Sequence, residues 1–120
     1  MTPDQFRRLA LSFADTEERA HHHHPDFRAK GKLFATLGYP DETRAMVKLT
    51  PEQQADFVHD HPTVFTPVNG AWGRQGCTSV HLPKATKTAL EPAVKAAYSN
   101  ALAALAAKPP SRKRKPKLSL

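Results

Sequence analysis

The segment DTEERAHHHHPDFRAKGKLFATLGYPDETRAMVKL, residues 15–49, decides the predicted fold. Gly31 and the cluster YPDET divide it into short runs that are rich in apolar or β-branched residues. Three of these runs, residues 27–30, 33–37 and 45–49, have the length of β-strands, and residues 17–22 are a candidate edge strand. The segment therefore predicts an antiparallel meander.

Helical patterns lie on both sides of this meander. Residues 2–5 (TPDQ) and 50–53 (TPEQ) both have the spacing of a capping box with Pro at the first helical position. They predict helices over about residues 3–14 and from residue 51 to Pro62, the second with a buried stripe of Ala55, Phe57 and Val58. The alanine-rich segment from about Thr88 to Pro109 predicts a long final helix, with Thr88 and Glu91 as its capping box and Pro92 tolerated in its first turn.

Residues 64–82 predict two more strands joined by a tight connection near Asn69-Gly70. The element order is then helix, three strands, helix, two strands, helix (α-β-β-β-α-β-β-α). This order predicts a two-layer α+β fold with the helices packed on one face of an antiparallel sheet.

Length and composition restrict the class of protein. The 120 residues are enough for one domain. No stretch approaches the roughly 20 apolar residues of a membrane span, and the N-terminal segment lacks the apolar core of a signal peptide. Cys77 is the only cysteine, which excludes an internal disulfide and a cysteine-rich zinc site. We expect a cytoplasmic monomer that makes no membrane contact.

The formal charge of +7 is concentrated at one end of the chain. Residues 1–107 contain 12 basic and 11 acidic groups, whereas the segment after Ala107 contains six basic groups and no acidic one. Its three prolines and high charge predict a disordered tail over residues 108–120, outside a single domain at residues 1–107. The basic residues of this tail are Lys108, Arg112, Lys113, Arg114, Lys115 and Lys117.

Four further segments carry a family resemblance: HPDFRAKGKLFATL, MVKLTPEQQ, FTPVNGAWGRQGCTSVHL and the helix containing AAYSNALA. From about Phe6 to Leu105 the chain resembles the MmcQ/YjbR family of small bacterial proteins, most specifically at residues 27–34 and 72–78. The resemblance implies the α+β fold described above, similar to frataxin-like and secretion-chaperone-like domains. It also implies DNA binding, which is proposed for this family on structural grounds through a double-wing arrangement, and no established enzymatic activity. The histidine run and the basic tail depart from the family pattern.

Two sets of residues suggest chemistry that their spacing does not favour. On an extended strand the run His21 to His24 alternates between faces, and only His59, His61 and His81 could complete a metal site, so we expect a polar loop or strand edge and no metal. Cys77 and His81 lie about 13 Å apart on a strand, too far for a nucleophile and its base. We expect Cys77 to be a small side chain in or near the sheet.

The segment GRQG, residues 73–76, matches the Gly-x-x-Gly loop with which KH domains hold nucleic-acid backbones. Because a strand and not a helix is expected after it, a β-turn explains the glycines more simply. Arg74 at the tip of this turn remains a candidate phosphate contact. Trp72 is either a base-stacking residue or part of the core or rim.

Basic residues provide the main candidate site. If residues 27–32 alternate as a strand, Arg28, Lys30 and Lys32 share a face and Phe27 and Ala29 face the other way. The candidate nucleic-acid contacts are then Arg28, Lys30, Lys32, Lys48 and Arg74, together with Arg112, Lys113, Arg114, Lys115 and Lys117 of the tail. The alternative is a solvated face balanced by acids such as Asp26, Asp41 and Glu42.

The basic residues and the family resemblance favour a DNA-binding protein. We expect no catalytic site and no cofactor, because no phosphate-binding loop, dinucleotide fingerprint, zinc-protease motif or serine triad is present. A module that binds a protein partner or a small ligand is the alternative. An enzyme would require a deep pocket lined by His24, Asp26, Arg28 or Trp72.

Overall fold

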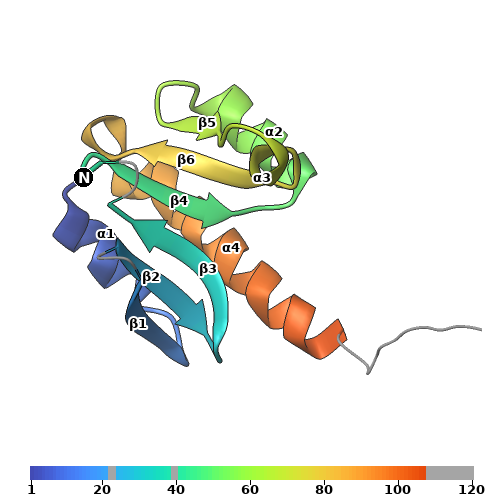
Figure 1. Cartoon of the computed structure of the whole chain (residues 1–120). Helices are drawn as coiled ribbons and strands as arrows, with labels where there is room; N and C mark the ends of the chain where they lie inside the picture. Colours follow the sequence, from blue (N-terminus) through green and yellow to red (C-terminus); the bar gives the residue numbers. More distant parts are fainter. Residues whose placement is uncertain (22–23, 39–40, 108–120) are drawn as a thin grey trace, which may run out of the picture.

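A six-stranded antiparallel sheet forms the centre of the molecule (Figure 1). The computed structural model describes residues 1–21, 24–38 and 41–107. Strand order across the sheet is β1-β2-β3-β4-β6-β5. The strands are β1 (Thr16–His21), β2 (His24–Ala29), β3 (Lys32–Leu37), β4 (Arg44–Lys48), β5 (Phe65–Pro67) and β6 (Cys77–His81). The helices are α1 (Pro3–Ala10), α2 (Pro51–Asp60), α3 (Ala71–Arg74) and α4 (Lys87–Ala107), with a 3-10 turn at Leu82–Lys84.

The three longer helices lie on one side of the sheet. Helix α4 packs across β3 and β4, and α1 packs beside it on β3 (Figure 1). Helix α2 is joined to α4 by the amide of Asn100, which donates to Gln53 Oε1 at 2.7 Å. The core between the layers contains Phe6, Phe27, Phe34, Phe65 and Leu90, all with no exposed surface. The predicted two-layer α+β fold is confirmed.

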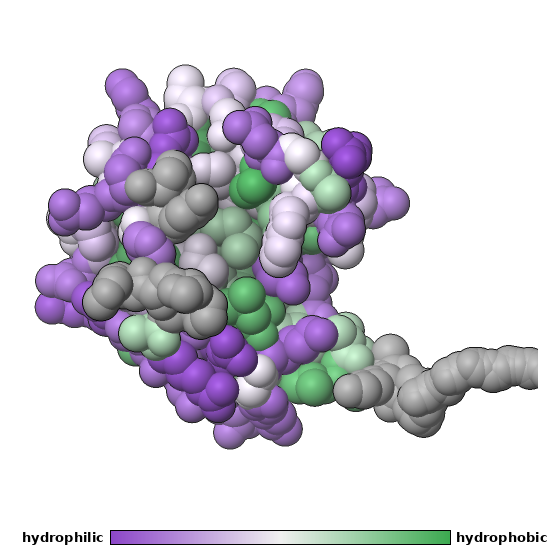
Figure 2. All heavy atoms as spheres, in the orientation of Figure 1, coloured by the Kyte–Doolittle hydropathy of each residue, from purple (hydrophilic) through white to green (hydrophobic). Residues whose placement is uncertain are grey.

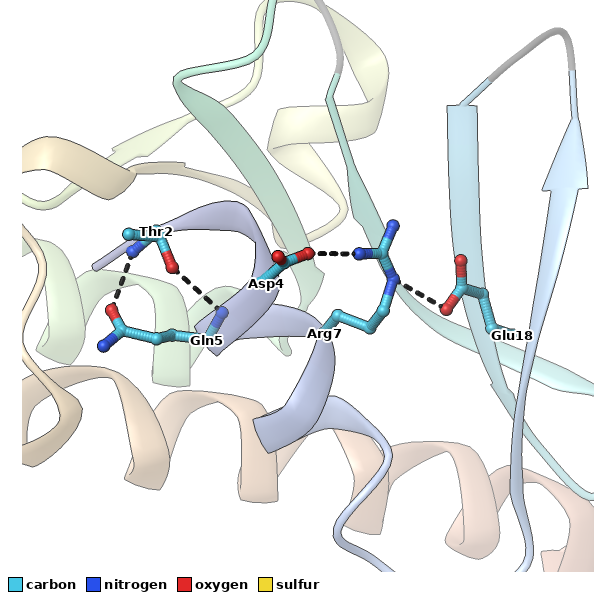
Figure 3. A network of polar contacts seen from close by, with 5 residues as sticks. All are labelled: Thr2, Asp4, Gln5, Arg7 and Glu18. Atoms are coloured by element: carbon cyan, nitrogen blue, oxygen red, sulfur yellow. Dashed lines mark hydrogen bonds and ion pairs between the residues drawn. The ribbon is translucent and has the colours of Figure 1, made fainter.

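The N-terminal capping box is confirmed and leads into a polar network (Figure 3). Gln5 N donates to Thr2 Oγ1 at 3.1 Å, and Thr2 N donates to Gln5 Oε1 at 2.9 Å. On the next turn Arg7 donates to Asp4 at 2.6 Å and to Glu18 at 2.9 Å. Because Glu18 lies on β1, this network attaches the edge strand to the helix layer.

Several element boundaries differ from those predicted. Helix α1 ends at Ala10, and the candidate edge strand forms as β1. Helix α2 has no buried residue: Ala55 is exposed, and Phe57 and Val58 are only half-buried. The predicted stripe is thus only partly formed: Phe57 and Val58 pack against the core and Ala55 does not, because α2 covers the end of the sheet at β5 and not its centre.

The start of the last helix and the connection before β6 were also predicted incorrectly. Ala89 N donates to Thr86 Oγ1 at 3.2 Å, so Thr86, not Thr88, caps α4. Pro92 then lies in the second turn, inside the helix. Strands β5 and β6 are not joined by a tight turn but by residues 68–76, which include the short helix α3.

A β-bulge in the β2–β3 pair determines which residues face each side. Phe27 is paired with Ala35, whereas the next residue, Arg28, is paired with Leu33, so Phe34 is the extra residue. As a result Phe34 and Ala35 both lie in the core. The bulge returns Leu33 to the side of Arg28, away from the helices.

Two predictions fall on residues that the structure does not describe. The tail at residues 108–120, with Arg112, Lys113, Arg114, Lys115 and Lys117, lies outside the described residues, as do His22 and His23. Within the described part of the chain, no helix is long and apolar enough to cross a membrane.

Candidate functional site on the open sheet face

The face of the sheet opposite α1 and α4, here called the open face, carries one row of side chains across all six strands. Directly paired residues of antiparallel strands lie on the same face. The pairs Arg19–Asp26, Asp26–Thr36, Thr36–Met46, Met46–Ser79 and Ser79–Thr66 therefore form a continuous row. Their neighbours Phe27, Ala35, Ala45, Val47 and Val80 are buried on the helix side.

A groove of about 1110 Å³ follows the middle of the open face. Figure 2 looks onto this face and shows apolar and weakly polar side chains at its centre, surrounded by hydrophilic ones. Its apolar lining includes Leu33, Met46, Pro67 and Val68, and its polar lining includes Thr36, Thr66, Asn69 and Ser79. The groove thus offers apolar contact area with hydrogen-bonding groups among it, as ligand sites do.

Asp26 and Arg28 form an ion pair in this groove. Arg28 Nε donates to Asp26 Oδ1 at 3.2 Å, and Arg28 Nη2 donates to Oδ2 at 3.3 Å. The Asp26 side chain is 9% exposed and that of Arg28 29%. The hydrogen bond and charge of Asp26 raise the pKa of Arg28 above its ordinary value. The pair fixes the Arg28 guanidinium in place and neutralises most of its charge.

Strand β4 supplies two cations without such a partner. Arg44 and Lys48 lie on the open face, paired with His81 and Cys77 of β6, and Arg44 lines the groove. Neither side chain forms an ion pair within the described part of the chain, although the hydrogen bonds from Thr43 and, after them, the charge of Arg44 lower the pKa of Asp41. By strand register, the charged residues of this face are Arg19, Arg28, Arg44, Lys48, Glu17 and Asp26, four basic and two acidic. Glu17 forms an ion pair with Arg19, and Asp26 forms one with Arg28. The excess positive charge of the open face therefore comes from Arg44 and Lys48 on β4.

The predicted strip of Arg28, Lys30 and Lys32 does not exist as one face. Strand β2 ends at Ala29, and Lys30 lies in the turn with a positive φ of 50°. Lys32 is paired with Ala29, whose side chain is buried on the helix side, so Lys32 does not lie on the open face. The prediction was wrong because the chain reverses at Lys30-Gly31 instead of continuing as a strand.

Arg74 lies at the end of helix α3 instead of at the tip of a turn, and Trp72 lies on the same helix. Trp72 is 64% exposed and lines the groove. A place for Trp72 in the core is therefore excluded, and base stacking stays a prediction. Arg74 is exposed at the end of α3 and is absent from the lining of the groove.

The glycines of GRQG have separate structural reasons. Gly76 has a φ of +112°, a conformation that side chains disfavour. Gly73 lies in α3, where a Cβ atom would stand 1.6 Å from the carbonyl oxygen of Val68. The expected turn therefore explains Gly76 but not Gly73, which permits α3 to pack tightly on the preceding loop.

Cys77 is a buried free thiol in β6, as predicted. Burial raises its pKa, an effect that nearby Lys48 offsets in part. A raised pKa keeps the thiol protonated near neutral pH, which disfavours a nucleophilic role. His81 lies four residues further along the same strand, and its buried Nδ1 has no hydrogen-bond partner among the described residues.

The four residues that were expected to line the pocket of an enzyme lie together in the structure. His24, Asp26, Arg28 and Trp72 all line the groove, which is partly open to solvent. Asp26 is the only carboxylate in the described lining, and both its oxygens accept hydrogen bonds from Arg28. Among the described residues, no group of three or more His, Cys, Asp and Glu side chains could hold a metal ion.

Sequence reasoning missed Arg44 and Met46, two central residues of the groove. The signal was present in the run RAMVK, residues 44–48, where Ala45 and Val47 alternate with longer or charged residues. Such alternation places residues 44, 46 and 48 on one face of a strand.

A sheet covered by helices on one side and carrying a groove on the other defines this protein as a two-layer α+β domain with an accessible sheet face. The model of the YjbR family matches residues 11–100, and the chain therefore belongs to the YjbR family. The crystal structure of the Deinococcus radiodurans protein DR2400, described as containing domain DUF419, has the same fold: its TM-score is 0.64 at 18% identity, over 81% of this chain and 75% of that chain. No curated protein matches the sequence.

Proposed function

We propose that this protein binds DNA through the open sheet face, without catalysing a reaction, and that the basic residues 108–120 add phosphate attraction. The observation that supports this best is the presence on β4 of two cations, Arg44 and Lys48, that form no ion pair among the described residues, beside a groove with only one carboxylate in its described lining. Phosphate contacts of this kind bind without reading base sequence. Arg28 contributes less, because Asp26 already occupies its guanidinium.

The test compares two double variants with the same change in charge on opposite sides of the molecule. Arg44→Gln with Lys48→Gln removes the two cations of the open face that form no ion pair among the described residues. Lys87→Gln with Lys95→Gln removes two exposed lysines from α4, which lies on the other side of the sheet. Affinity for a labelled DNA duplex is measured by fluorescence anisotropy over a series of salt concentrations.

Each lost phosphate contact lowers the slope of log affinity against log salt by about 1, so the β4 variant is expected to lose about 2. The α4 variant keeps the slope of the unaltered protein. Equal losses in both variants would mean that only total charge matters, and unchanged binding in the β4 variant would exclude the open face.

A second candidate function is the binding of an acidic peptide or small ligand in the same groove. The apolar lining formed by Leu33, Met46, Pro67 and Val68 favours it, because phosphate-directed binding alone does not use such a surface. Purification of the full chain after exhaustive nuclease digestion distinguishes the two. A partner that survives digestion and is lost on Arg44→Gln favours this candidate over DNA.

A further inference from the structure

We propose that the groove binds an unpaired DNA base stacked on Trp72, which makes single-stranded DNA the preferred ligand. This inference depends on the DNA binding proposed above and specifies its substrate class. Trp72 is 64% exposed, whereas the Phe and Tyr residues that the structure describes are all buried at least in part. Among the described residues, no aromatic ring packs against this indole.

The backbone that carries Trp72 is held firmly. Its neighbour Gly73 is buried and lies so close to Val68 that a methyl group would not fit between them. Gln54 Nε2 donates to the Gly73 carbonyl oxygen at 3.0 Å and also to that of Cys77 at 3.0 Å, which ties α3 to both α2 and β6. Because this backbone is already fixed, binding at Trp72 would need to order only its side chain.

An indole face can stack only on a base whose own face is accessible. In the interior of a duplex each base is stacked on both sides and shows only its edges in the grooves, so Trp72 has no face to contact there. An unpaired base offers its whole face, and stacking on an aromatic side chain is the usual way in which single strands are held.

The remainder of the groove suits the other parts of a nucleotide. Thr66, Asn69 and Ser79 supply hydroxyl and amide groups that can meet the donors and acceptors of a base edge. Arg44, which lines the same groove and has no ion-pair partner among the described residues, is available to a backbone phosphate. The groove thus combines an aromatic face, polar edges and a cation.

Trp72 is the only tryptophan of the chain, so its own fluorescence reports the proposed contact. The full chain is titrated at low salt with oligo(dT) of about 12 nucleotides, with a duplex of the same length, and with an abasic strand that has the same number of phosphates. We expect saturable quenching by oligo(dT) alone, since the other two ligands present phosphates without an accessible base face.

Variants are then compared by anisotropy with labelled oligo(dT). Trp72→Leu is expected to weaken binding by about 5- to 150-fold, the range found when a stacked aromatic is removed. Trp72→Phe keeps a ring face and is expected to retain most of the affinity. Because Trp72 is mostly exposed, neither change removes a core contact.

The outcomes separate this inference from the function on which it depends. Equal affinity for duplex and oligo(dT), with no quenching and no effect of Trp72→Leu, overturns the inference and leaves DNA binding intact. Absence of binding to every one of the three ligands at low salt overturns both. Quenching by the abasic strand as strong as that by oligo(dT) also overturns the inference, because stacking would not be its cause.

Discussion

Gly73 shows how one residue connects packing with the candidate site. Its missing side chain lets α3 approach Val68, and this approach sets where Trp72 stands at the rim of the groove. A larger residue would have to displace the backbone of Val68 or of α3 itself, since the atom in contact is a carbonyl oxygen and not the end of a flexible side chain.

We therefore expect Gly73→Ala to lower the free energy of unfolding by about 1–3 kcal/mol, the usual cost of forcing extra volume into a packed site. It should also weaken oligo(dT) quenching of Trp72, because α3 is displaced. Gly31→Ala is the control: it costs about 1–2 kcal/mol through its left-handed φ of +85°, but nothing lies within 4 Å of the added atom and the groove is unaffected. Urea unfolding measures both variants. If Gly73→Ala had the same free energy of unfolding as the unaltered protein, this account would be wrong.

At the scale of elements, the β2–β3 hairpin shows what local sequence determines. Lys30 and Gly31 form its two-residue turn, and both have positive φ values, 50° and 85°. This is the type I′ arrangement, which suits the twist of the strands and favours Asn-Gly over other pairs. Gly31 fits the turn. Lys30 adopts the left-handed conformation, which is about 1–2 kcal/mol less favourable for a residue that has a side chain.

Lys30→Asn is therefore expected to raise the free energy of unfolding by about 0.5–1 kcal/mol, because Asn tolerates the left-handed region. Lys30→Gln serves as the control, since it removes the same charge without that tolerance and should leave stability unchanged. Urea denaturation measures both. Equal stabilisation in the two variants would attribute the gain to charge and not to backbone conformation.

Elements whose signals are local were predictable, and features that depend on contacts distant in sequence were not. The capping boxes at residues 2–5 and 50–53 and the strand runs between Gly31 and Leu49 were found because each is complete within a few residues. The bulge at Phe34 was missed because one extra residue leaves an apolar run looking regular. His24, Asp26, Arg28 and Trp72 were named as a possible pocket lining, but the part of the groove that β4 and β5 supply was missed, because its described lining comes from β2 to β6 and α3, which only the folded sheet brings together.

At the scale of the whole molecule, charge is divided unequally between the domain and the end of the chain. Residues 1–107 have nearly equal numbers of basic and acidic groups, and the excess on the open face is limited to Arg44 and Lys48. The segment after Ala107 contains six cations, three times the number of excess cations on the open face. Affinity for a polyanion should come largely from the segment after Ala107, whereas any preference among DNA forms should come from the groove.

Removal of residues 108–120 tests this division. Since each engaged cation contributes about 0.9 to the slope of log affinity against log salt on duplex DNA, the truncated chain is expected to lose a slope of roughly 4–5 if most of the six cations are engaged. Its urea unfolding should match that of the full chain, because every core residue lies before residue 108 in the described structure. Its preference for oligo(dT) over duplex, measured as a ratio of affinities at one salt concentration, should persist or increase, because the segment removed attracts both ligands alike. Equal duplex binding by the full and truncated chains would show that the segment takes no part, and a lost preference would show that the groove does not discriminate by itself.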